Sequence, residues 1–360
     1  MTSTTPFPTP AQLAARARAD LRMGLPVVLA SGALAAAAET ADERTLALFA
    51  GEPEASLALS AWRARTLKAT AYDGDLVRVA LPPDVSPAWV RALADPSGDL
   101  ATPLKGPLRG LREGTATPHR AALALAKTAR LLPAALVRPV AQPARFARDH
   151  DLTLVPAGAE LSEDPPALGQ VISARVPLSV SDAGRVHVFR PDDGGEEHYA
   201  VEIGAPDRAR PVLVRLHSAC FTGDVLGSLK CDCGPQLRAA MGQMGAEGAG
   251  VLLYLMQEGR GIGLANKMRA YSLQDQGFDT VEANHRLGFE DDERDFRVGA
   301  QLLKRLGISK VRLMTNNPAK VARLESCGIE VTERVPLKVG ETPQNAGYLA
   351  TKAAKSGHLL

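Results

Sequence analysis

The second half of the chain alternates between the apolar periods of strands and of helices. Residues 211–217 form a short apolar run, which predicts a buried strand. The segment from Pro235 to Met244 then repeats apolar residues at helical spacing, which predicts an amphipathic helix with proline in its first turn. Residues 250–256 predict the next strand, and a glycine-rich turn at 257–263 follows it.

The same order recurs toward the C-terminus. Leu264 and Tyr271 lie at helical spacing after the turn, and Gly277 ends the helix that they predict. Residues 311–314 predict another strand, and residues 315–318, Thr-Asn-Asn-Pro, predict a capped helix start. Repeated strand, turn and helix predict an α/β fold, in which helices cover a mixed sheet and functional loops lie at the strand ends.

The first half is rich in alanine, leucine and arginine and carries weaker patterns. Residues 11–23 have a helical period that Gly24 ends, and residues 27–30 predict a strand behind that helix. A stretch rich in glycine, proline and arginine at 96–118 predicts a disordered segment before a second helix at 120–132. We expect a second, N-terminal α/β domain here.

Composition supports two domains and excludes several classes of function. The 360 residues are 45% hydrophobic and 23% charged, and residues 158–169, with two adjacent prolines, predict a linker. We place the boundary near residue 165, giving domains 1–165 and 166–360. The net charge of +2 argues against nucleic acid. No stretch approaches the roughly eighteen apolar residues of a membrane span, and the start of the chain lacks a signal-peptide pattern, so we expect a cytoplasmic protein.

Cys220, Cys231 and Cys233 are the strongest chemical signal in the chain. Three thiolates can hold Zn²⁺ with its fourth position open for a reactive water. The remaining cysteine, Cys327, is far away in the sequence, which makes a closed four-cysteine site harder to build. The alternative is that these are unrelated buried thiols, since free cysteine is often buried. His217 and His285 are weaker metal candidates, because three thiolates already suffice.

Other segments could bind an anion. The glycines around Arg260 permit close approach of the backbone to a phosphate, although a plain strand-to-helix turn has the same pattern. Thr315 and Lys320 flank a predicted helix start, where backbone N–H groups favour an anion, but Lys320 could equally be a solvated lysine. Residues 291–295 form a charge cluster that is either a solvated helix start or an acid/base group beside a cation.

Three segments together carry a family resemblance: RLHSACFTGDVLGSLKCDCGPQL, QEGRGIGLANKMRAYSLQDQGFDTVEANHRLGFEDDERDF and MTNNPAKVARLESCGIEVTERVPL. They resemble GTP cyclohydrolase II, the zinc enzyme that opens the purine ring of GTP at the start of riboflavin synthesis. The resemblance covers about residues 170–360. It implies a GTP cyclohydrolase II-like C-terminal domain, one zinc per chain, Mg²⁺ with the triphosphate, GTP as substrate and a homodimer.

The resemblance also implies roles for individual residues. The implied zinc ligands are Cys220, Cys231 and Cys233. Asp292 matches the family's proton acceptor, Arg294 its proposed nucleophile toward the α-phosphate, and Tyr271 the tyrosine of ring hydrolysis. The positions that match GTP-binding residues are Arg215, Leu216, His217, Ser218, Ala219, Gln236, Glu258, Gly259, Arg260, Thr280, Thr315 and Lys320.

This assignment fits general chemistry, with one role left open. Zinc held by thiolates would activate a water that opens the guanine ring at C8 and releases formate, and Mg²⁺ would neutralise the departing pyrophosphate. Arginine at its ordinary pKa is a poor nucleophile, so phosphate clamping is the alternative role for Arg294. The chain departs from the family at Ala219, often Glu, and at Met256, often Arg. Two other functions remain: a homologue acting on another ring, as in pyrimidine catabolism, and a non-catalytic nucleotide-binding regulator.

The first half resembles another family more faintly, through ARADLRMGLPVVL and AALALAKTARLLPAALVRPVAQPARFARDHDLTLV. These segments are similar to the start and end of 3,4-dihydroxy-2-butanone 4-phosphate synthase, which binds Mg²⁺ through an acidic loop. In this chain the acids of that loop are thinned to Glu39, Asp42 and Glu43, and prolines 118 and 139 replace the family's histidine and glutamate. Without oxygen ligands the Mg²⁺ site cannot form, so we expect a non-catalytic domain kept for packing, dimerisation or regulation.

Overall fold

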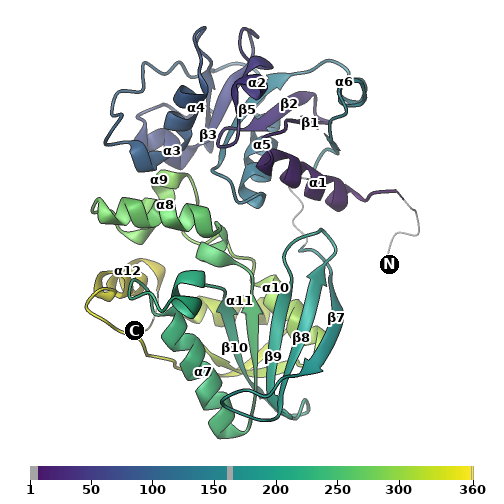
Figure 1. Ribbon diagram of the computed structural model, residues 1–360, viewed down its shortest axis with the longest axis vertical. Coiled ribbons are helices and arrows are strands. Elements are labelled where there is room, and N and C mark those ends of the chain that lie inside the picture. Colours follow the sequence, from purple (N-terminus) through teal and green to yellow (C-terminus); the bar gives the residue numbers. More distant parts are fainter. Residues whose placement is uncertain (1–6, 160–164, 358, 360) are drawn as a thin grey trace. The chain divides into compact units, whose positions relative to one another are not determined.

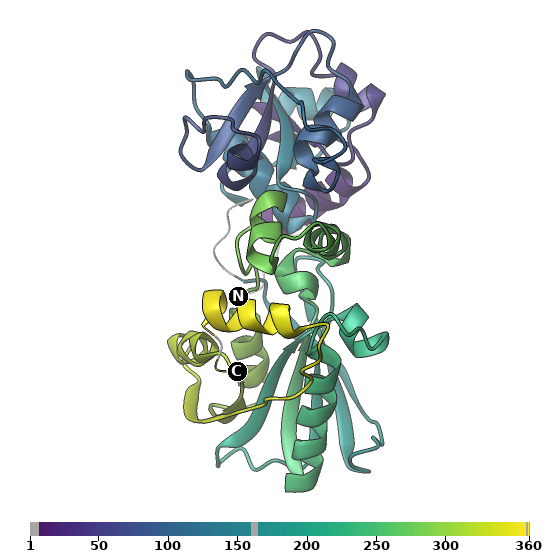
Figure 2. The ribbon, with the colours of Figure 1, turned by 90° about the vertical axis from the view of Figure 1, so that its left-hand side faces the viewer.

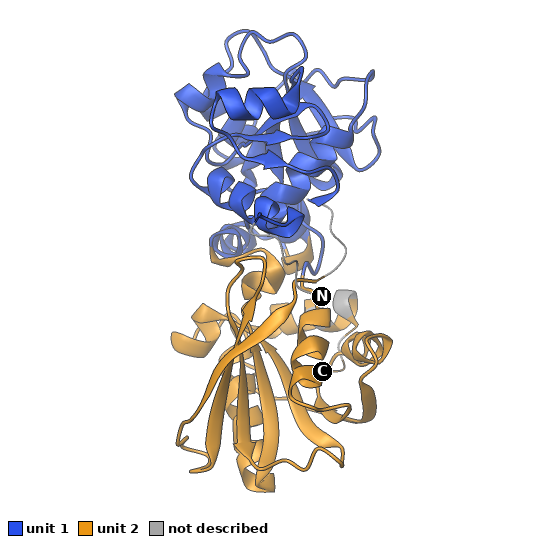
Figure 3. Cartoon of the chain, turned by 90° about the vertical axis from the view of Figure 1, so that its right-hand side faces the viewer, with its two compact units in different colours: residues 1–164, 265–278, 282–293 blue, residues 165–264, 279–281, 294–360 orange. Residues whose placement is uncertain are grey.

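The computed structural model describes residues 7–159, 165–357 and 359, which form two compact units (Figure 3). Unit 1 consists of Met1–Asp164, Ala265–Phe278 and Glu282–Glu293, and unit 2 consists of Pro165–Leu264, Asp279–Val281 and Arg294–Leu360. Of the predicted linker at 158–169, residues 160–164 lie outside the described residues. The assignment of residues 1–165 and 166–360 to two domains of different function stays a prediction.

Unit 1 is built on a six-stranded sheet with the order β4-β3-β5-β2-β1-β6. All neighbours in it are antiparallel except β1 and β6, which are parallel. The strands are β1 (Val27–Leu29), β2 (Ala33–Ala37), β3 (Ser56–Ser60), β4 (Leu76–Ala80), β5 (Ala134–Pro139) and β6 (Leu154–Val155). Every residue of β1, β2 and β3 is buried, so these strands show no alternation of polar and apolar residues.

The helices of unit 1 come from both parts of the sequence (Figure 1). Those before residue 165 are α1 (Pro10–Arg22), α2 (Glu43–Ala47), α3 (Ala61–Thr66), α4 (Pro87–Ala94), the 3₁₀ turn η1 (Pro96–Gly98), α5 (Thr117–Thr128) and α6 (Pro143–Asp149). Most of α8 (Leu264–Asp275) and α9 (Thr280–Leu287) also belongs to this unit. A capping box fixes the start of α1, where Thr9 and Gln12 exchange hydrogen bonds.

Two predictions for the first half need correction. The helix expected at 120–132 begins at Thr117, because proline fits its first turn, and it ends at Thr128, before Arg130 adopts a left-handed φ of 61°. The segment 96–118 is irregular but not disordered. Asp99 forms a two-pronged ion pair with the buried Arg63, at 2.6 and 2.8 Å, and the Leu111 N–H donates to the Arg78 carbonyl.

Unit 2 is built on a seven-stranded mixed sheet with the order β13-β12-β10-β11-β9-β8-β7. The strands are β7 (Leu168–Arg175), β8 (Gly184–Pro191), β9 (His198–Gly204), β10 (Val212–Ser218), β11 (Ala249–Leu255), β12 (Lys310–Met314) and β13 (Glu330–Val335). The four strands from β13 to β11 are mutually parallel, and β9, β8 and β7 continue the sheet antiparallel. The predicted α/β fold with a mixed sheet is confirmed.

Helices cover both faces of this sheet. The helical elements of unit 2 are the π-turn η3 (Phe221–Val225), α7 (Cys233–Glu247), the 3₁₀ turn η4 (Glu258–Gly261), α10 (Arg297–Arg305), α11 (Pro318–Ser326) and α12 (Ala346–Ser356). Ala240 and Met244 of α7 pack on one face of the sheet, along which Figure 2 shows this helix lying. Leu302 of α10 and Leu324 of α11 join the apolar cluster of the other face.

The carboxyl ends of three parallel neighbours carry the segments that the sequence marks as chemical. Cys220 follows β10, Glu258 follows β11 and Thr315 follows β12. Parallel strands end at the same edge of a sheet, so the fold gathers these three segments there. Among the described residues, no helix is long and apolar enough to cross a membrane.

Candidate functional site

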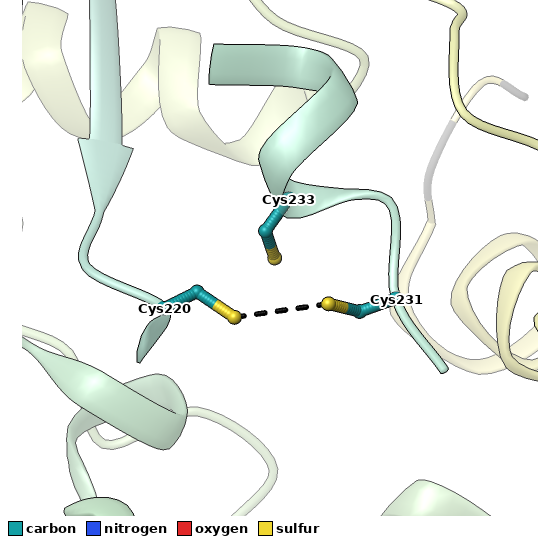
Figure 4. Close-up of side chains that lie close together, drawn as sticks. All are labelled: Cys220, Cys231 and Cys233. Atoms are coloured by element: carbon teal, nitrogen blue, oxygen red, sulfur yellow. Dashed lines mark hydrogen bonds between the residues drawn. The ribbon is translucent and has the colours of Figure 1, made fainter. Parts of the chain in front are cut away.

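Three cysteine thiols converge beyond the carboxyl end of β10. Cys220 lies two residues after that strand, Cys231 lies in the loop just before α7, and Cys233 is the first residue of that helix (Figure 4). The three Sγ atoms lie within 4.8 Å of one another, and those of Cys220 and Cys231 are 3.7 Å apart. Two thiolates on one tetrahedral zinc, each at a bond length of about 2.3 Å, stand about 3.8 Å apart. The spacing therefore fits a shared zinc ion.

The pKa shifts of the thiols fit a site that binds a cation. Contact with Cys220 and Cys231, followed by burial, raises the pKa of the Cys233 thiol well above its ordinary value, and contact with Cys220 also raises the pKa of Cys231. A cation among the three thiols would favour their deprotonated forms. Within the described part of the chain, these cysteines are the one group of three or more His, Cys, Asp or Glu residues placed to hold a metal, and Cys327 is outside it.

Gly223 leaves the space into which the thiols point. A Cβ atom at this position would lie 2.8 Å from the Cys231 Sγ atom and 3.1 Å from the Cys220 Sγ atom. Ordinary contacts between nonbonded heavy atoms are about 3.5–4.0 Å. Any side chain at 223 would therefore push the sulfur atoms away from their common centre.

A buried polar network holds the backbone of the first cysteine. The Asp224 carboxylate accepts a hydrogen bond from the Cys220 N–H at 3.0 Å and one from the Tyr254 hydroxyl at 2.9 Å. The His217 Nε2 atom lies 3.0 Å from both oxygens of the same carboxylate. Burial lowers the pKa of His217, although Asp224 opposes this shift. His217 is thus an orienting partner of Asp224 and lies outside the cysteine group.

A second buried chain connects β10 to the cysteine loop. The Arg215 guanidinium donates to the Met314 carbonyl at 2.9 Å and to the Gln236 Oε1 atom at 2.5 Å. The Gln236 amide in turn donates to Asp232, between the two later cysteines, at 2.6 Å. Burial lowers the pKa of Arg215 to about 10, so the side chain is still cationic near neutral pH. The structure thus brings the predicted residues Arg215 and Gln236 together.

Cationic side chains gather around the Phe296 ring. Arg294, Lys320 and Arg323 have their charged groups 5.0, 5.3 and 4.9 Å from its centroid. Arg294 also donates to the Ser218 hydroxyl at 3.3 Å, at the end of β10. Three cationic side chains close together favour binding of an anion, so this group is a candidate phosphate site.

The remaining predicted residues of unit 2 lie in backbone turns or in the core. Glu258 accepts hydrogen bonds from the N–H groups of Phe221, at 2.6 Å, and Gly259, at 2.9 Å. Gly259 and Arg260 have φ angles of 64° and 61°, and for arginine this left-handed conformation is strained. The other predicted positions are Leu216 in the sheet core, Ala219 donating its N–H to Leu255, Thr315 buried after β12, and Thr280 at the first residue of α9.

Two of the predicted catalytic residues belong to unit 1. Tyr271 lies on α8, with the Lys267 ammonium 5.7 Å from its ring centroid, and Asp292 lies in the segment after α9. His285, a weak metal candidate from the sequence, stacks on Trp62 with 3.6 Å between ring centroids. His285 lies outside the cysteine group.

Sequence reasoning missed several residues of the site. Asp224, Tyr254 and Phe296 carry no motif of their own, since their roles depend on contacts between elements that are distant in the sequence. Gly223 did leave a signal, because it is a glycine three residues after Cys220, where a small residue leaves room for the thiols.

Comparison with known proteins identifies relatives over nearly the whole chain. Residues 169–336 match the family model described as GTP cyclohydrolase II. A GTP cyclohydrolase-2 from Azospirillum brasilense is 45% identical over 361 residues, covering 96% of this chain and 93% of that protein. A GTP cyclohydrolase-2 from Azotobacter vinelandii is 61% identical over 175 residues, 49% of this chain and 84% of its own.

A riboflavin biosynthesis protein RibBA from Bacillus mycoides is 59% identical over 165 residues, 46% of this chain and 42% of that protein. A solved structure of a two-domain 3,4-dihydroxy-2-butanone 4-phosphate synthase from A. baumannii aligns over 89% of this chain and 98% of its own, with 18% identity and a TM-score of 0.31. At that score the alignment carries no argument about this chain, so the resemblance of the first half to a synthase stays a prediction.

Proposed function

Because the chain belongs to the GTP cyclohydrolase II family of hydrolases, we propose that it hydrolyses GTP to 2,5-diamino-6-ribosylamino-4(3H)-pyrimidinone 5′-phosphate, formate and pyrophosphate. The observation that carries this proposal is the convergence of Cys220, Cys231 and Cys233, whose Sγ atoms lie within 4.8 Å of one another. We propose that they hold one Zn²⁺. When bound there, zinc would supply a Lewis acid that activates water near neutral pH.

The cations around Phe296 support triphosphate binding. Arg294, which donates a hydrogen bond to Ser218, would bind the α-phosphate through two N–H groups of its planar guanidinium. The Lys320 ammonium would add a second positive charge near the same phosphate. Mg²⁺ would accompany the triphosphate and neutralise the departing pyrophosphate. Arginine at its ordinary pKa is protonated and a poor nucleophile, which favours a clamp role for Arg294 over a covalent one.

Other residues would act on the base and its proton transfers. Asp292 would accept a proton and Tyr271 would orient the opened formamide through its hydroxyl. Arg215 and Gln236, with Glu258, Gly259, Arg260, Thr280 and Thr315, would form the remainder of the GTP site. Asp224 would keep Cys220 in place without contact with substrate.

Two alternative functions differ in measurable ways. A homologue acting on another ring would release formate from a compound other than GTP, and a nucleotide-binding regulator would bind GTP without releasing formate or pyrophosphate. The preserved cysteine cluster argues against the regulator, which has no need for an activated water. Incubation with GTP, ATP and uridine compounds, with formate and pyrophosphate measured separately, distinguishes the three.

The test of the zinc assignment uses the fourth cysteine as a control. Cys231→Ser should lose zinc and formate release together, whereas Cys327→Ser, outside the cluster, should keep both. Full formate release by a zinc-free Cys231→Ser protein would exclude the assignment. The four cysteines are free, and free cysteines together with GTP as substrate suit a reducing cytoplasm, so we also propose a cytoplasmic enzyme. From the family we propose that the enzyme is a homodimer.

A further inference from the structure

The segments that carry Tyr271 and Asp292 fold together with the N-terminal half of the chain. Residues 265–278 and 282–293 fall within the family match at 169–336, yet they belong to unit 1 with Met1–Asp164 (Figure 3). The packing of these two segments is therefore set by residues that lie before the matched region.

Arg269 is the main anchor of α8, and it stands two residues before Tyr271. Its Nε atom donates to Asp95 and its Nη2 atom to Glu39, both at 2.9 Å. Burial disfavours charge on Arg269, but Glu39 and Asp95 outweigh this and raise its pKa. The second oxygen of Glu39 accepts the Leu132 N–H at 2.8 Å, which fixes the carboxylate to the backbone before β5.

Asn266 and Gln276 extend the attachment to both ends of α8. Asn266 is fully buried, donates to the Arg130 carbonyl at 3.0 Å and accepts a hydrogen bond from Arg269 at 2.7 Å. Gln276, just after the helix, donates to the Ser97 carbonyl at 3.2 Å. Both hydrogen bonds are partly buried and end on backbone carbonyls, so they orient the helix as well as attach it.

The segment around Asp292 is attached in a similar way. Lys127 of α5 donates to Glu293 at 2.7 Å, and the same Glu293 oxygen accepts the Glu290 N–H at 2.9 Å. Trp62 of α3 donates its indole N–H to Glu290 at 3.0 Å. A Cβ atom at Gly288 would lie 2.7 Å from the Ser60 hydroxyl, so the chain passes directly against the N-terminal half of the unit.

Glu39 is also one of the three acids, with Asp42 and Glu43, that follow the first predicted strand. The resemblance of the first half to a synthase implies a Mg²⁺-binding loop at this position. The two oxygens of Glu39 accept hydrogen bonds from Arg269 and from the Leu132 N–H. The carboxylate is thus engaged in a contact that holds α8.

We propose that Glu39, Asp95 and Lys127 are positioning residues, through which the N-terminal half sets the placement of Tyr271 and Asp292 for ring opening. The proposal rests on the proposed function, because it assumes that these two residues act on GTP. Misplacement of catalytic groups by about 1 Å can cost about 100-fold in rate. Loss of one anchoring contact should therefore slow formate release strongly without removing zinc.

The test compares Glu39→Gln with Asp73→Asn. Both replace a carboxylate that pairs with an arginine inside unit 1, since Asp73 accepts from Arg78 at 2.8 Å, but Asp73 has no described contact with α8. We expect Glu39→Gln to lower kcat for formate release by about 10- to 100-fold, with KM for GTP changed less and zinc content unchanged. Glu39→Asp should recover part of this loss, and Asp73→Asn should stay close to wild type.

Hydrogen exchange provides a measurement that does not depend on activity. Amides of residues 265–278 should exchange faster in Glu39→Gln, while those of α7 in unit 2 should not change. If the wild-type protein releases no formate from GTP, the proposed function fails, and exchange alone then decides whether Glu39 holds α8. Equal formate loss in both variants, unchanged formate release by Glu39→Gln, or unchanged exchange at 265–278 would each overturn the inference.

Discussion

Replacement of Gly223 by alanine tests the geometry of the cysteine site directly. The added Cβ atom would lie 2.8 Å from the Cys231 Sγ atom, 3.1 Å from that of Cys220 and 3.0 Å from the Cys233 Cβ atom. Ordinary contact begins at about 3.5 Å, so one sulfur must move by about 0.7 Å or more. Metal–ligand distances in a good site hold within about 0.2 Å, so this movement is several times the tolerance.

The expected size of the effect follows from the cost of overpacking. Inserting a methyl group into a well-packed site costs about 1–3 kcal/mol. If that cost falls on the zinc-bound form, zinc affinity falls by about 5- to 150-fold, at about 1.4 kcal/mol per tenfold. The thermal midpoint of the zinc-loaded protein should fall with it, because a bound metal stabilises the folded state.

The assay is competition for zinc with a chelating dye, on Gly223→Ala and on the control Gly242→Ala. Gly242 lies on α7, and a Cβ atom there would have no neighbour within 4 Å. The control should bind zinc normally and be as stable as wild type or slightly more, because alanine favours a helix. Wild-type zinc affinity in Gly223→Ala would refute the inference that the thiols converge on a common ion.

Three further predictions follow from other parts of the structure. Arg294→Lys should lower pyrophosphate and formate release alike, because a point charge cannot reproduce the planar fork; normal pyrophosphate release would exclude a clamp role. Tyr271→Phe should still release pyrophosphate while slowing formate release, and parallel loss of both with a lowered melting temperature would leave Tyr271 as packing only. Burial lowers the pKa of His119 from 6.5 to about 4, so between these pH values the unfolded chain binds more protons and stability falls as pH falls, by on the order of 3 kcal/mol. His119→Gln should flatten this part of the urea-unfolding stability curve, and an unchanged slope would contradict the assignment.

The sequence predicted the three strands and the helix nearest the cysteine group closely because their apolar periods are strong. The strands expected at 211–217, 250–256 and 311–314 are Val212–Ser218, Ala249–Leu255 and Lys310–Met314. The helix expected from 235 to 244 runs from Cys233 to Glu247. The convergence of the three cysteines was also expected, because a possible metal site depends on residue type and local spacing, which a sequence displays.

The sequence could not predict arrangements that depend on distant contacts. Strands such as Ala33–Ala37 have small residues buried on both faces, so no alternation marks them. Asp224 is important only because β10 and β11 bring His217 and Tyr254 to it. The attachment of α8 to Glu39 joins residues 230 positions apart in the chain, which no local pattern can reveal.

The discontinuity of unit 1 has a consequence for synthesis on the ribosome. Its last segment, Glu282–Glu293, leaves the ribosome roughly 130 residues after Asp164, a delay of about 6–26 s at 5–20 residues per second. Until then the surfaces that later receive Phe289 and Asn266 stay uncovered, although the six strands of the unit have already been made. We therefore expect the nascent N-terminal half to bind chaperones. A chain that ends before residue 265 would leave the Glu39 carboxylate and the Arg130 carbonyl without the hydrogen bonds that Arg269 and Asn266 donate to them.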